Sequence, residues 1–341
     1  MTSGSVAMSA PPRLDAGIVR RALREAGLRP RHGLSQVFLA DIDVLEAILE
    51  LAAPGPGRRI LEIGPGLGIL TGGLLAAGTS VTAIELDRGL AARLREEYAE
   101  AIARDGATAL DSSMAGVLRL IEGDALDQDL TALLPPPYEV VANLPYHITS
   151  PILHALLGRP PRPERAVLMV QREVAERIVA PPGSMSYLSA FVQYHAAARI
   201  ALLVPREAFE PAPAVDSAVI VLEPRDGAAS SRLGAEREDE LWRLVQAAFR
   251  ERRKMIHNVL SRQLPIDRSR LDAALGAARI APDRRPQTLA VDEWLALLAA
   301  IGPIGPDRRG RGSSSEPSVL GEPDAPEAAA EEATEPGVAP P

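Results

Sequence analysis

The sequence contains no cysteine and a single lysine, and aromatic residues make up only 3% of its 341 positions. The absence of cysteine excludes disulfide bonds and thiolate metal sites. No apolar run approaches the roughly 18 residues of a membrane-spanning helix. The N-terminus lacks a basic stretch followed by an apolar one, so we expect no secretory signal. These absences favour a cytoplasmic protein without a membrane partner.

The net charge of −8 is concentrated at one end of the chain. Residues 312–341 contain seven acidic residues and no basic one, which leaves about −1 for the rest. From residue 303 onward the chain is rich in Pro, Gly, Ser, Glu and Ala, and it has almost no large apolar side chain. This composition predicts a disordered acidic tail over residues 303–341, so the net charge does not exclude a nucleic-acid partner.

Short apolar segments alternate with helical patterns over about 200 residues, which predicts an α/β fold with a mostly parallel sheet. We expect strands at 58–63, 80–85, 118–121, 138–142, 166–170, 199–204 and 217–222. We expect helices between them at 41–52, 88–100 and 151–157, and helices without strands at 238–264, 268–275 and 291–301.

Four parts of the chain follow from these patterns. The first is a leader with a short helix (1–30), whose expected apolar contacts are Ile18, Leu23 and Leu28. An α/β domain (31–225), a small all-helical domain (235–302) and the tail (303–341) come after it.

A buried strand runs into a glycine-rich turn between residues 60 and 68, which read Ile-Leu-Glu-Ile-Gly-Pro-Gly-Leu-Gly. Gly64, Gly66 and Gly68 allow close approach of the backbone to a ligand and permit positive φ angles. The spacing fits neither a dinucleotide fingerprint nor a phosphate-binding loop that ends in Gly-Lys-Ser/Thr. A tight turn without a ligand is the alternative interpretation.

Acidic residues end the next two predicted strands. Glu85 follows the second strand and can accept hydrogen bonds from both hydroxyls of a ribose, and Asp124 follows the third and can accept one from an adenine amino group. Together with Glu62 before the turn, this pattern resembles the class I S-adenosylmethionine methyltransferases. The resemblance implies a Rossmann-like, seven-stranded sheet with S-adenosylmethionine bound at its edge.

The fourth predicted strand ends in Asn143-Leu144-Pro145-Tyr146, which resembles the N/D-P-P-Y motif of amino-group methyltransferases. The N6 lone pair of adenine is delocalised, so a catalyst must hold the amine in a reactive geometry. The Asn143 side-chain oxygen and the Leu144 carbonyl can accept its two N–H bonds. Pro145 stiffens the loop, and Tyr146 offers a ring for stacking the base. The target adenine must leave its stack, and a proline-stopped turn is the alternative.

Residues 31–302 resemble the small-subunit ribosomal RNA adenine dimethyltransferase family. The stretches that carry the resemblance are 33–41, 143–151, 169–177, 209–217, 249–254 and 285–289. It implies dimethylation of two adjacent adenines in a hairpin near the 3′ end of 16S ribosomal RNA, within an immature small ribosomal subunit. We also expect a monomer.

Two further positions are expected near the cofactor and the base. Val37 stands where the family usually has Asn or His, so only its backbone can reach the methionine end of the cofactor, while Leu39 lines the pocket. Phe209, in the segment Phe-Glu-Pro-Ala-Pro, is a candidate for the second face of the adenine opposite Tyr146. A core phenylalanine is the equally open alternative.

Arg250, Arg252, Arg253 and Lys254 form the densest basic cluster, and we expect them to contact RNA phosphates. A solvated helix face is the alternative. His147 and His154 lack nearby carboxylate ligands, so we expect no metal site.

Two other functions stay open: methylation of large-subunit ribosomal RNA, and a non-catalytic role in ribosome assembly. A DNA adenine methylase fits less well, because it would carry Asp-Pro-Pro-Tyr and a target-recognition domain.

Overall fold

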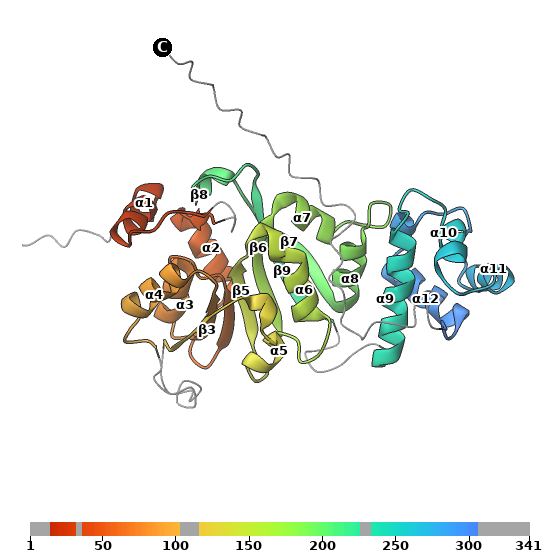
Figure 1. Cartoon of the computed structure of the whole chain (residues 1–341), viewed down its shortest axis with the longest axis horizontal. Coiled ribbons are helices and arrows are strands. Elements are labelled where there is room, and N and C mark those ends of the chain that lie inside the picture. The colour runs from red at the N-terminus through yellow and green to blue at the C-terminus, as the bar shows by residue number, and fades with distance from the viewer. Residues whose placement is uncertain (1–13, 32–35, 103–115, 226–232, 306–341) are drawn as a thin grey trace, which may run out of the picture. The chain divides into compact units, whose positions relative to one another are not determined.

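The computed structural model describes residues 14–31, 36–102, 116–225 and 233–305. A seven-stranded sheet with the order β4-β3-β2-β5-β6-β9-β7 forms its centre (Figure 1). The strands are β2 (Arg59–Ile63), β3 (Ser80–Glu85), β4 (Leu118–Glu122), β5 (Glu139–Asn143), β6 (Arg165–Gln171), β7 (Ala196–Val204) and β9 (Ser217–Pro224). The pairs from β4 to β6 are parallel, and β9 is antiparallel to β6 and β7. The predicted mostly parallel sheet is confirmed.

Helices cover both faces of this sheet, because apolar residues in its strands point alternately to either side. Val167 and Met169 pack with α2 (Ile42–Ala52) and α3 (Ile69–Ala76). Leu168 and Val170 face the opposite helices. These helices are α5 (Leu130–Leu133), α6 (Thr149–Leu157), α7 (Arg172–Ile178) and α8 (Tyr187–His195). Leucine and isoleucine side chains buried in this way each contribute roughly 1.5–3 kcal/mol to folding.

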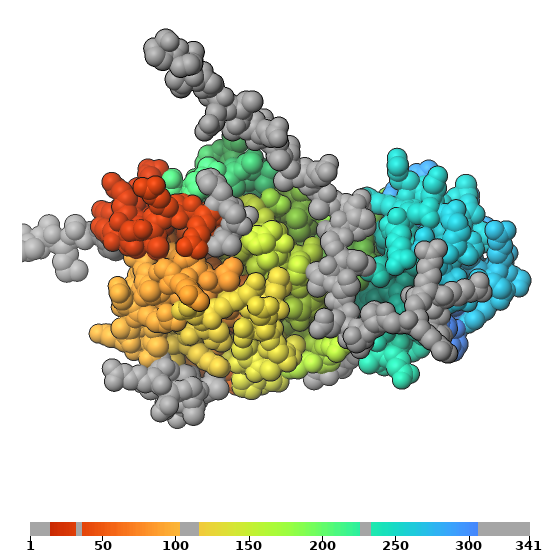
Figure 2. Space-filling model, in the orientation of Figure 1, coloured from red at the N-terminus to blue at the C-terminus, as the bar shows by residue number. Residues whose placement is uncertain are grey.

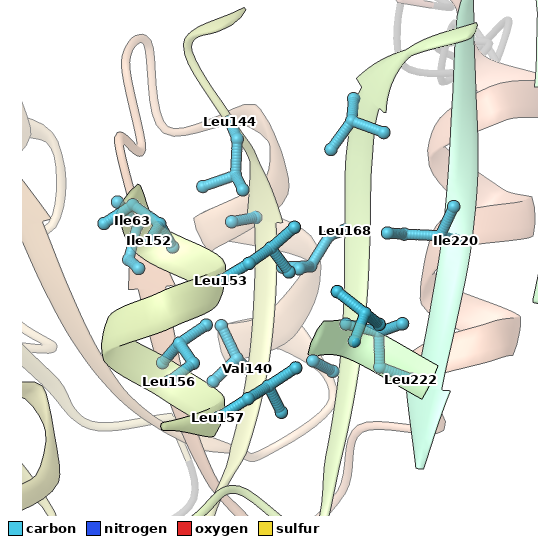
Figure 3. Packing of buried hydrophobic residues seen from close by; sticks show 14 of the residues in the cluster. Ile63, Val140, Leu144, Ile152, Leu153, Leu156, Leu157, Leu168, Ile220 and Leu222 are labelled. Carbon is cyan, nitrogen blue, oxygen red and sulfur yellow. The ribbon is translucent and has the colours of Figure 1, made fainter. Parts of the chain in front are cut away.

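Helix α6 illustrates how the sheet edge that carries the site is supported. Four residues of this helix are buried and point toward the strands in Figure 3, namely Ile152, Leu153, Leu156 and Leu157. They pack against Val140 of β5 and Leu168 of β6 in the same cluster. The helix therefore supports strand β5, whose last residue, Asn143, begins the Asn-Leu-Pro-Tyr loop.

The N-terminal helix α1 (Ala16–Glu25) begins at Asp15, whose carboxylate accepts a hydrogen bond from the Ile18 amide at 2.9 Å. Its buried residues are Val19 and Leu23, so the predicted contact at Leu23 is confirmed and Val19 takes the inward place expected for Ile18. Figure 2 shows α1 in red against the orange residues that follow it. These include α4 (Arg88–Glu97), whose Leu90 shares a cluster with α1.

A two-stranded ladder joins distant parts of the chain. Strand β1 (Phe38–Leu39) pairs antiparallel with β8 (Phe209–Glu210), and Leu39 lies opposite Phe209. The Ala40 amide extends the ladder by donating a hydrogen bond to the Ala208 carbonyl at 2.8 Å. Single-turn helices complete this part of the fold at η3 (Ala125–Asp127), η4 (Tyr146–Ile148) and η5 (Arg206–Ala208).

Beyond residue 233 the described chain is helical, as predicted. The elements are α9 (Ala235–Phe249), α10 (Ile256–Gln263), α11 (Arg268–Ala277), η6 (Pro286–Thr288) and α12 (Val291–Ile301). Their buried cluster also takes in Met185, Ala190 and Tyr194, so packing is continuous with α8. The stretch predicted to be helical over 238–264 is divided in two, because residues 250–255 form a turn between α9 and α10.

Several predicted features fall outside the described residues: the start of the leader (1–13), residues 33–35 of the family-like segment, and the tail from residue 306. Among the residues that the structure does describe, no helix is long and apolar enough to cross a membrane.

Candidate active site

The site lies at the C-terminal ends of the parallel strands, where ligands bind in open α/β sheets. One pocket there brings together residues from segments that are far apart in the sequence. Its lining includes the predicted residues Val37, Leu39, Gly64, Gly66, Glu85, Asp124, Asn143, Leu144 and Pro145. Residues expected to bind the cofactor and residues expected to hold the target amine therefore share one cavity.

The glycine turn forms the floor of the pocket. Gly64 and Gly66 have φ angles of 69° and 60°, which side chains other than glycine rarely adopt. A Cβ atom on Gly66 would lie 3.2 Å from the Phe38 ring, and one on Gly64 would lie 3.6 Å from Cδ of Pro145. Glycine at these positions keeps space between the turn, the segment above it and the Asn-Leu-Pro-Tyr loop.

Gly68 has a different role, since it is not among the described residues that line the pocket. It precedes α3 with φ of 81°, and a Cβ there would lie 2.7 Å from both Leu94 and the Tyr98 ring. The Tyr98 hydroxyl donates a hydrogen bond to the Gly68 carbonyl at 2.7 Å. Gly68 therefore supports the pocket through close packing of α3 against α4, not by direct contact.

Two buried carboxyl groups face the pocket. Glu85 is 5% exposed, and its oxygens accept hydrogen bonds from the Gly66 amide at 2.9 Å and the Asp87 amide at 2.8 Å. Burial raises the pKa of Glu85. Burial, and to a smaller extent the Glu85 carboxylate, raises the pKa of Glu62 to about 8, although Thr71 donates a hydrogen bond to it at 2.7 Å. Burial thus favours the protonated form of both carboxyl groups, whereas a cation bound beside them would favour the charged form.

Asp124 and Leu86 lie on the more open side of the pocket. Asp124 precedes η3, and its Oδ1 accepts a hydrogen bond from the Leu126 amide at 2.8 Å. That bond fixes the carboxylate at the pocket, where its second oxygen can accept from a ligand. Leu86 is 47% exposed although it contributes to the lining, so it marks the mouth of the pocket.

The Asn-Leu-Pro-Tyr loop closes the inner end. The Leu144 amide donates a hydrogen bond to the Met169 carbonyl at 3.1 Å, which ties the loop to β6. The Asn143 side-chain nitrogen donates to the Val37 carbonyl at 3.4 Å, so the Asn143 amide oxygen points in another direction. The Val37 backbone, not its side chain, therefore orients Asn143, the first residue of the motif.

Tyr146 and Phe209 lie outside the described pocket lining. The Tyr146 side chain is half-buried, and its hydroxyl lies 2.9 Å from Oγ of Ser217. Phe209 is 2% exposed and packs in one cluster with Val44 and Leu45 of α2. This position agrees with the core alternative for Phe209, and its contact with a substrate base stays a prediction.

The basic cluster occupies the turn between α9 and α10, not a helix face. Arg250, Arg253 and Lys254 are exposed and Arg252 is half-buried. Arg250 donates a hydrogen bond to the Gln263 side chain at 3.1 Å, and Arg252 donates one to Gln287 at 3.3 Å. These two hydrogen bonds connect the turn that carries the cations to α10 and to η6.

Sequence reasoning missed three supporting contacts. Thr71 binds Glu62, and the Gln36 side chain lies 3.4 Å from an Asp87 carboxylate oxygen, to which it donates. Ser217 binds Tyr146. Thr71 lies in the first turn of α3, directly after the glycine turn, so a search for hydroxyl partners of Glu62 would have found it. No local pattern marks the other two.

The hydrogen-bond acceptors at the pocket fit S-adenosylmethionine. Glu85 can accept hydrogen bonds from ribose hydroxyls, Asp124 from the adenine amino group, and the Glu62 carboxyl from the methionine amino group. The glycine turn supplies the close backbone approach. Within the described part of the chain, no cluster of three or more His, Cys, Asp or Glu side chains could hold a metal ion.

Comparisons with known proteins agree with this chemistry. The family model for ribosomal RNA adenine dimethylase matches residues 27–301. Ribosomal RNA small subunit methyltransferase A of Moorella thermoacetica is 42% identical over 82% of this chain and 95% of its own length. The protein of the same name from Synechococcus elongatus is 38% identical, over 80% of this chain and 95% of its own.

Solved structures show the same fold. A dimethyladenosine transferase from Plasmodium falciparum superposes with a TM-score of 0.63 at 25% identity, covering 77% of this chain and 96% of that one. The 23S rRNA methyltransferase ErmE gives a TM-score of 0.59 at 28% identity, over 77% of this chain and 99% of that one. The chain therefore belongs to the ribosomal RNA adenine dimethylase family, whose members are methyltransferases that use S-adenosylmethionine.

Proposed function

We propose that the chain dimethylates N6 of two adjacent adenines in a hairpin near the 3′ end of 16S ribosomal RNA. The observation that carries this proposal is the pocket in which Asn143 and Leu144 meet the cofactor-binding residues. The small-subunit specificity rests on the curated relatives, which are named for that subunit and match along nearly their whole length.

The cofactor, when bound, supplies an electrophilic methyl group on a positively charged sulfur. Glu85 would accept hydrogen bonds from the ribose hydroxyls, and Asp124 would accept one from the adenine amino group. Gly64 and Gly66 admit the ligand close to the backbone, while Val37 and Leu39 cover it. A positive charge bound beside Glu62 would favour the ionised form of this carboxyl, against the burial that raises its pKa.

The target amine is held by acceptors. The Asn143 amide oxygen and the Leu144 carbonyl accept hydrogen bonds from the two N–H groups of the amine. These bonds favour a tetrahedral geometry at the nitrogen. The Asn143 nitrogen is already engaged by the Val37 carbonyl, so the oxygen is the group left to face the substrate. Such prepositioned groups need no reorganisation as the reaction proceeds.

The base must leave its stack to reach this pocket, which favours an unpaired or extruded adenine. In this proposal Tyr146 stacks on one face of the adenine. The exposed cations at residues 250, 253 and 254, together with Arg252, bind RNA phosphates at a distance from the chemistry. Anchoring of their turn by Gln263 and Gln287 supports that role, because a fixed surface loses less entropy on binding.

We further propose that the substrate is an immature small ribosomal subunit and that the enzyme acts as a cytoplasmic monomer.

A second candidate function is methylation of large-subunit RNA, which the similarity to ErmE favours. A non-catalytic assembly factor is the third. The cofactor residues and the Asn-Leu-Pro-Tyr loop are brought together at one pocket, which supports catalysis.

A transfer assay separates these candidates. Immature small subunits, large subunits and protein-free 16S RNA are each incubated with the full chain and radiolabelled S-adenosylmethionine, and the modified positions are mapped by mass spectrometry. We expect dimethyladenosine at two neighbouring positions in the small-subunit RNA. Label confined to large subunits would establish the second candidate. No transfer to any of the three, with cofactor binding intact, would establish the third.

A further inference from the structure

A pair of hydroxyl groups links the catalytic loop to strand β9, which is two strands away from β5 in the sheet. Tyr146, in η4 directly after Pro145, places its hydroxyl 2.9 Å from Oγ of Ser217. Ser217 is the first residue of β9, has no exposed surface and lies 71 positions along the chain. The contact is therefore a tertiary restraint on the loop.

Ser217 is well suited to act as a fixed point. Its backbone is in register with Gln171 of β6 on one side and with Val204 of β7 on the other. The carbonyl of the preceding residue, Asp216, accepts a hydrogen bond from the Arg172 amide at 3.0 Å. A side chain on a strand paired on both sides moves less than one on a loop.

Tyr146 reaches this anchor across β6. Strand β6 separates β5 from β9, and Tyr146 lies in η4, three residues after the end of β5, so the contact depends on where this loop places the ring. Burial raises the pKa of Tyr146, so the hydroxyl stays protonated and able to share a hydrogen bond. A ring held at its loop end and at its hydroxyl end has little freedom left to turn.

We propose that Ser217 is a positioning residue for methyl transfer, which holds the Tyr146 ring in the orientation that stacks on the target adenine. The inference rests on the proposed function, in which Tyr146 contacts the base. It predicts an effect on the transfer step and not on cofactor binding, because neither residue lies in the described lining of the cofactor pocket.

The test compares Ser217→Ala, Tyr146→Phe and the double variant in the full chain, with immature small subunits as substrate. A neutral hydrogen bond of this kind corresponds to about a 3- to 10-fold fall in kcat for each single variant. The KM for S-adenosylmethionine should stay at the wild-type value. The double variant should be no slower than the slower single variant, because both changes remove the same bond.

Ser189→Ala is the matched control. Ser189 is also a fully buried serine, and its hydroxyl donates to the Arg177 carbonyl at 2.6 Å, away from the catalytic loop. It should lower the melting temperature without lowering kcat per folded molecule. Were Ser217→Ala not to fold, Tyr146→Phe alone decides, since it keeps the ring and removes only the hydroxyl.

Two results would overturn the inference. One is wild-type kcat in folded Tyr146→Phe or Ser217→Ala, and the other is losses that multiply in the double variant. An absence of dimethyladenosine in the wild-type reaction would instead reject the proposed function, so the two failures are distinguishable.

Discussion

The side-chain nitrogen of Asn143 donates to the backbone carbonyl of Val37 across 106 positions of sequence, at 3.4 Å. This contact joins the segment proposed to cover the cofactor to the loop proposed to hold the target amine. Because a backbone carbonyl makes the contact, it does not depend on which side chain stands at position 37. The valine therefore leaves the orientation of Asn143 intact.

We expect Asn143→Ala to lower kcat by roughly 10²-fold, as found when one prepositioned hydrogen-bonding group is removed from an active site. Asn143→Asp should be similarly slow, because a carboxylate cannot donate to the Val37 carbonyl. The measurement is single-turnover methyl transfer, with cofactor affinity measured separately. A variant that loses only cofactor affinity and keeps its transfer rate would contradict the assigned role.

The raised pKa of Glu62 predicts a pH-dependent stability of the cofactor-free protein. The folded state holds this proton up to a pKa of about 8, whereas the ordinary glutamate pKa of 4.5 applies on unfolding. The folded state thus binds more protons between these values, and stability falls as pH rises through that window. Denaturant unfolding from pH 5 to 8.5 should show a smaller fall for Glu62→Gln than for the wild type. Parallel profiles would contradict the prediction.

Gly68 and Gly57 form a natural pair for separating backbone strain from steric overlap. Both have φ near 80°, but a Cβ on Gly57 would meet nothing within 4 Å. We expect Gly57→Ala to cost about 1–2 kcal/mol of unfolding free energy. Gly68→Ala should cost about 1–3 kcal/mol more, because Leu94 and Tyr98 must move. Equal losses by urea denaturation would show that the packing around Gly68 is loose.

Phe209→Ala tests whether this ring serves the core or the substrate. Its burial predicts a loss of about 3–5 kcal/mol in unfolding free energy. Phe209→Leu keeps most of the apolar volume and should cost much less. A large fall in kcat per folded molecule of Phe209→Leu would place the ring against the base, and an unchanged kcat would assign it to the core alone.

Neutralising Arg253 and Lys254 should weaken RNA binding and its dependence on salt. Removal of one phosphate-binding cation reduces the slope of log K against log salt by about 1. Arg119→Gln is the control, because this exposed arginine lies on β4, at the opposite edge of the sheet from β7. A slope unchanged in the Arg253→Gln/Lys254→Gln variant would remove the cluster from the RNA interface.

Local pattern predicted most of the sheet, because buried strands carry dense apolar residues and end in functional ones. The strand predicted at 80–85 matches β3, and Glu85 ends it. Strand β7 begins at Ala196, before the predicted start at 199, because alanines carry no strand signal and pairing with β9 extends the strand. Tertiary pairing overrides propensity there.

Interactions between distant segments were beyond sequence reasoning. The chain from 238 to 264 has no glycine or proline before Pro265, so nothing local predicts the turn at 250–255. The turn exists because α10 folds back to pack with α9 and α11. Ser217 and Tyr146 illustrate the same limit, since only the completed sheet brings their hydroxyls together.

The pairing of Leu39 with Phe209 holds one wall of the pocket in place. Each methyl group delivered uses up one cofactor molecule, so a dimethylated base needs a fresh one between its two transfers. The wall at Leu39 cannot swing outward without parting the ladder that holds it to β8. If the ladder stays paired, a ligand would have to enter and leave past the exposed side chain of Leu86.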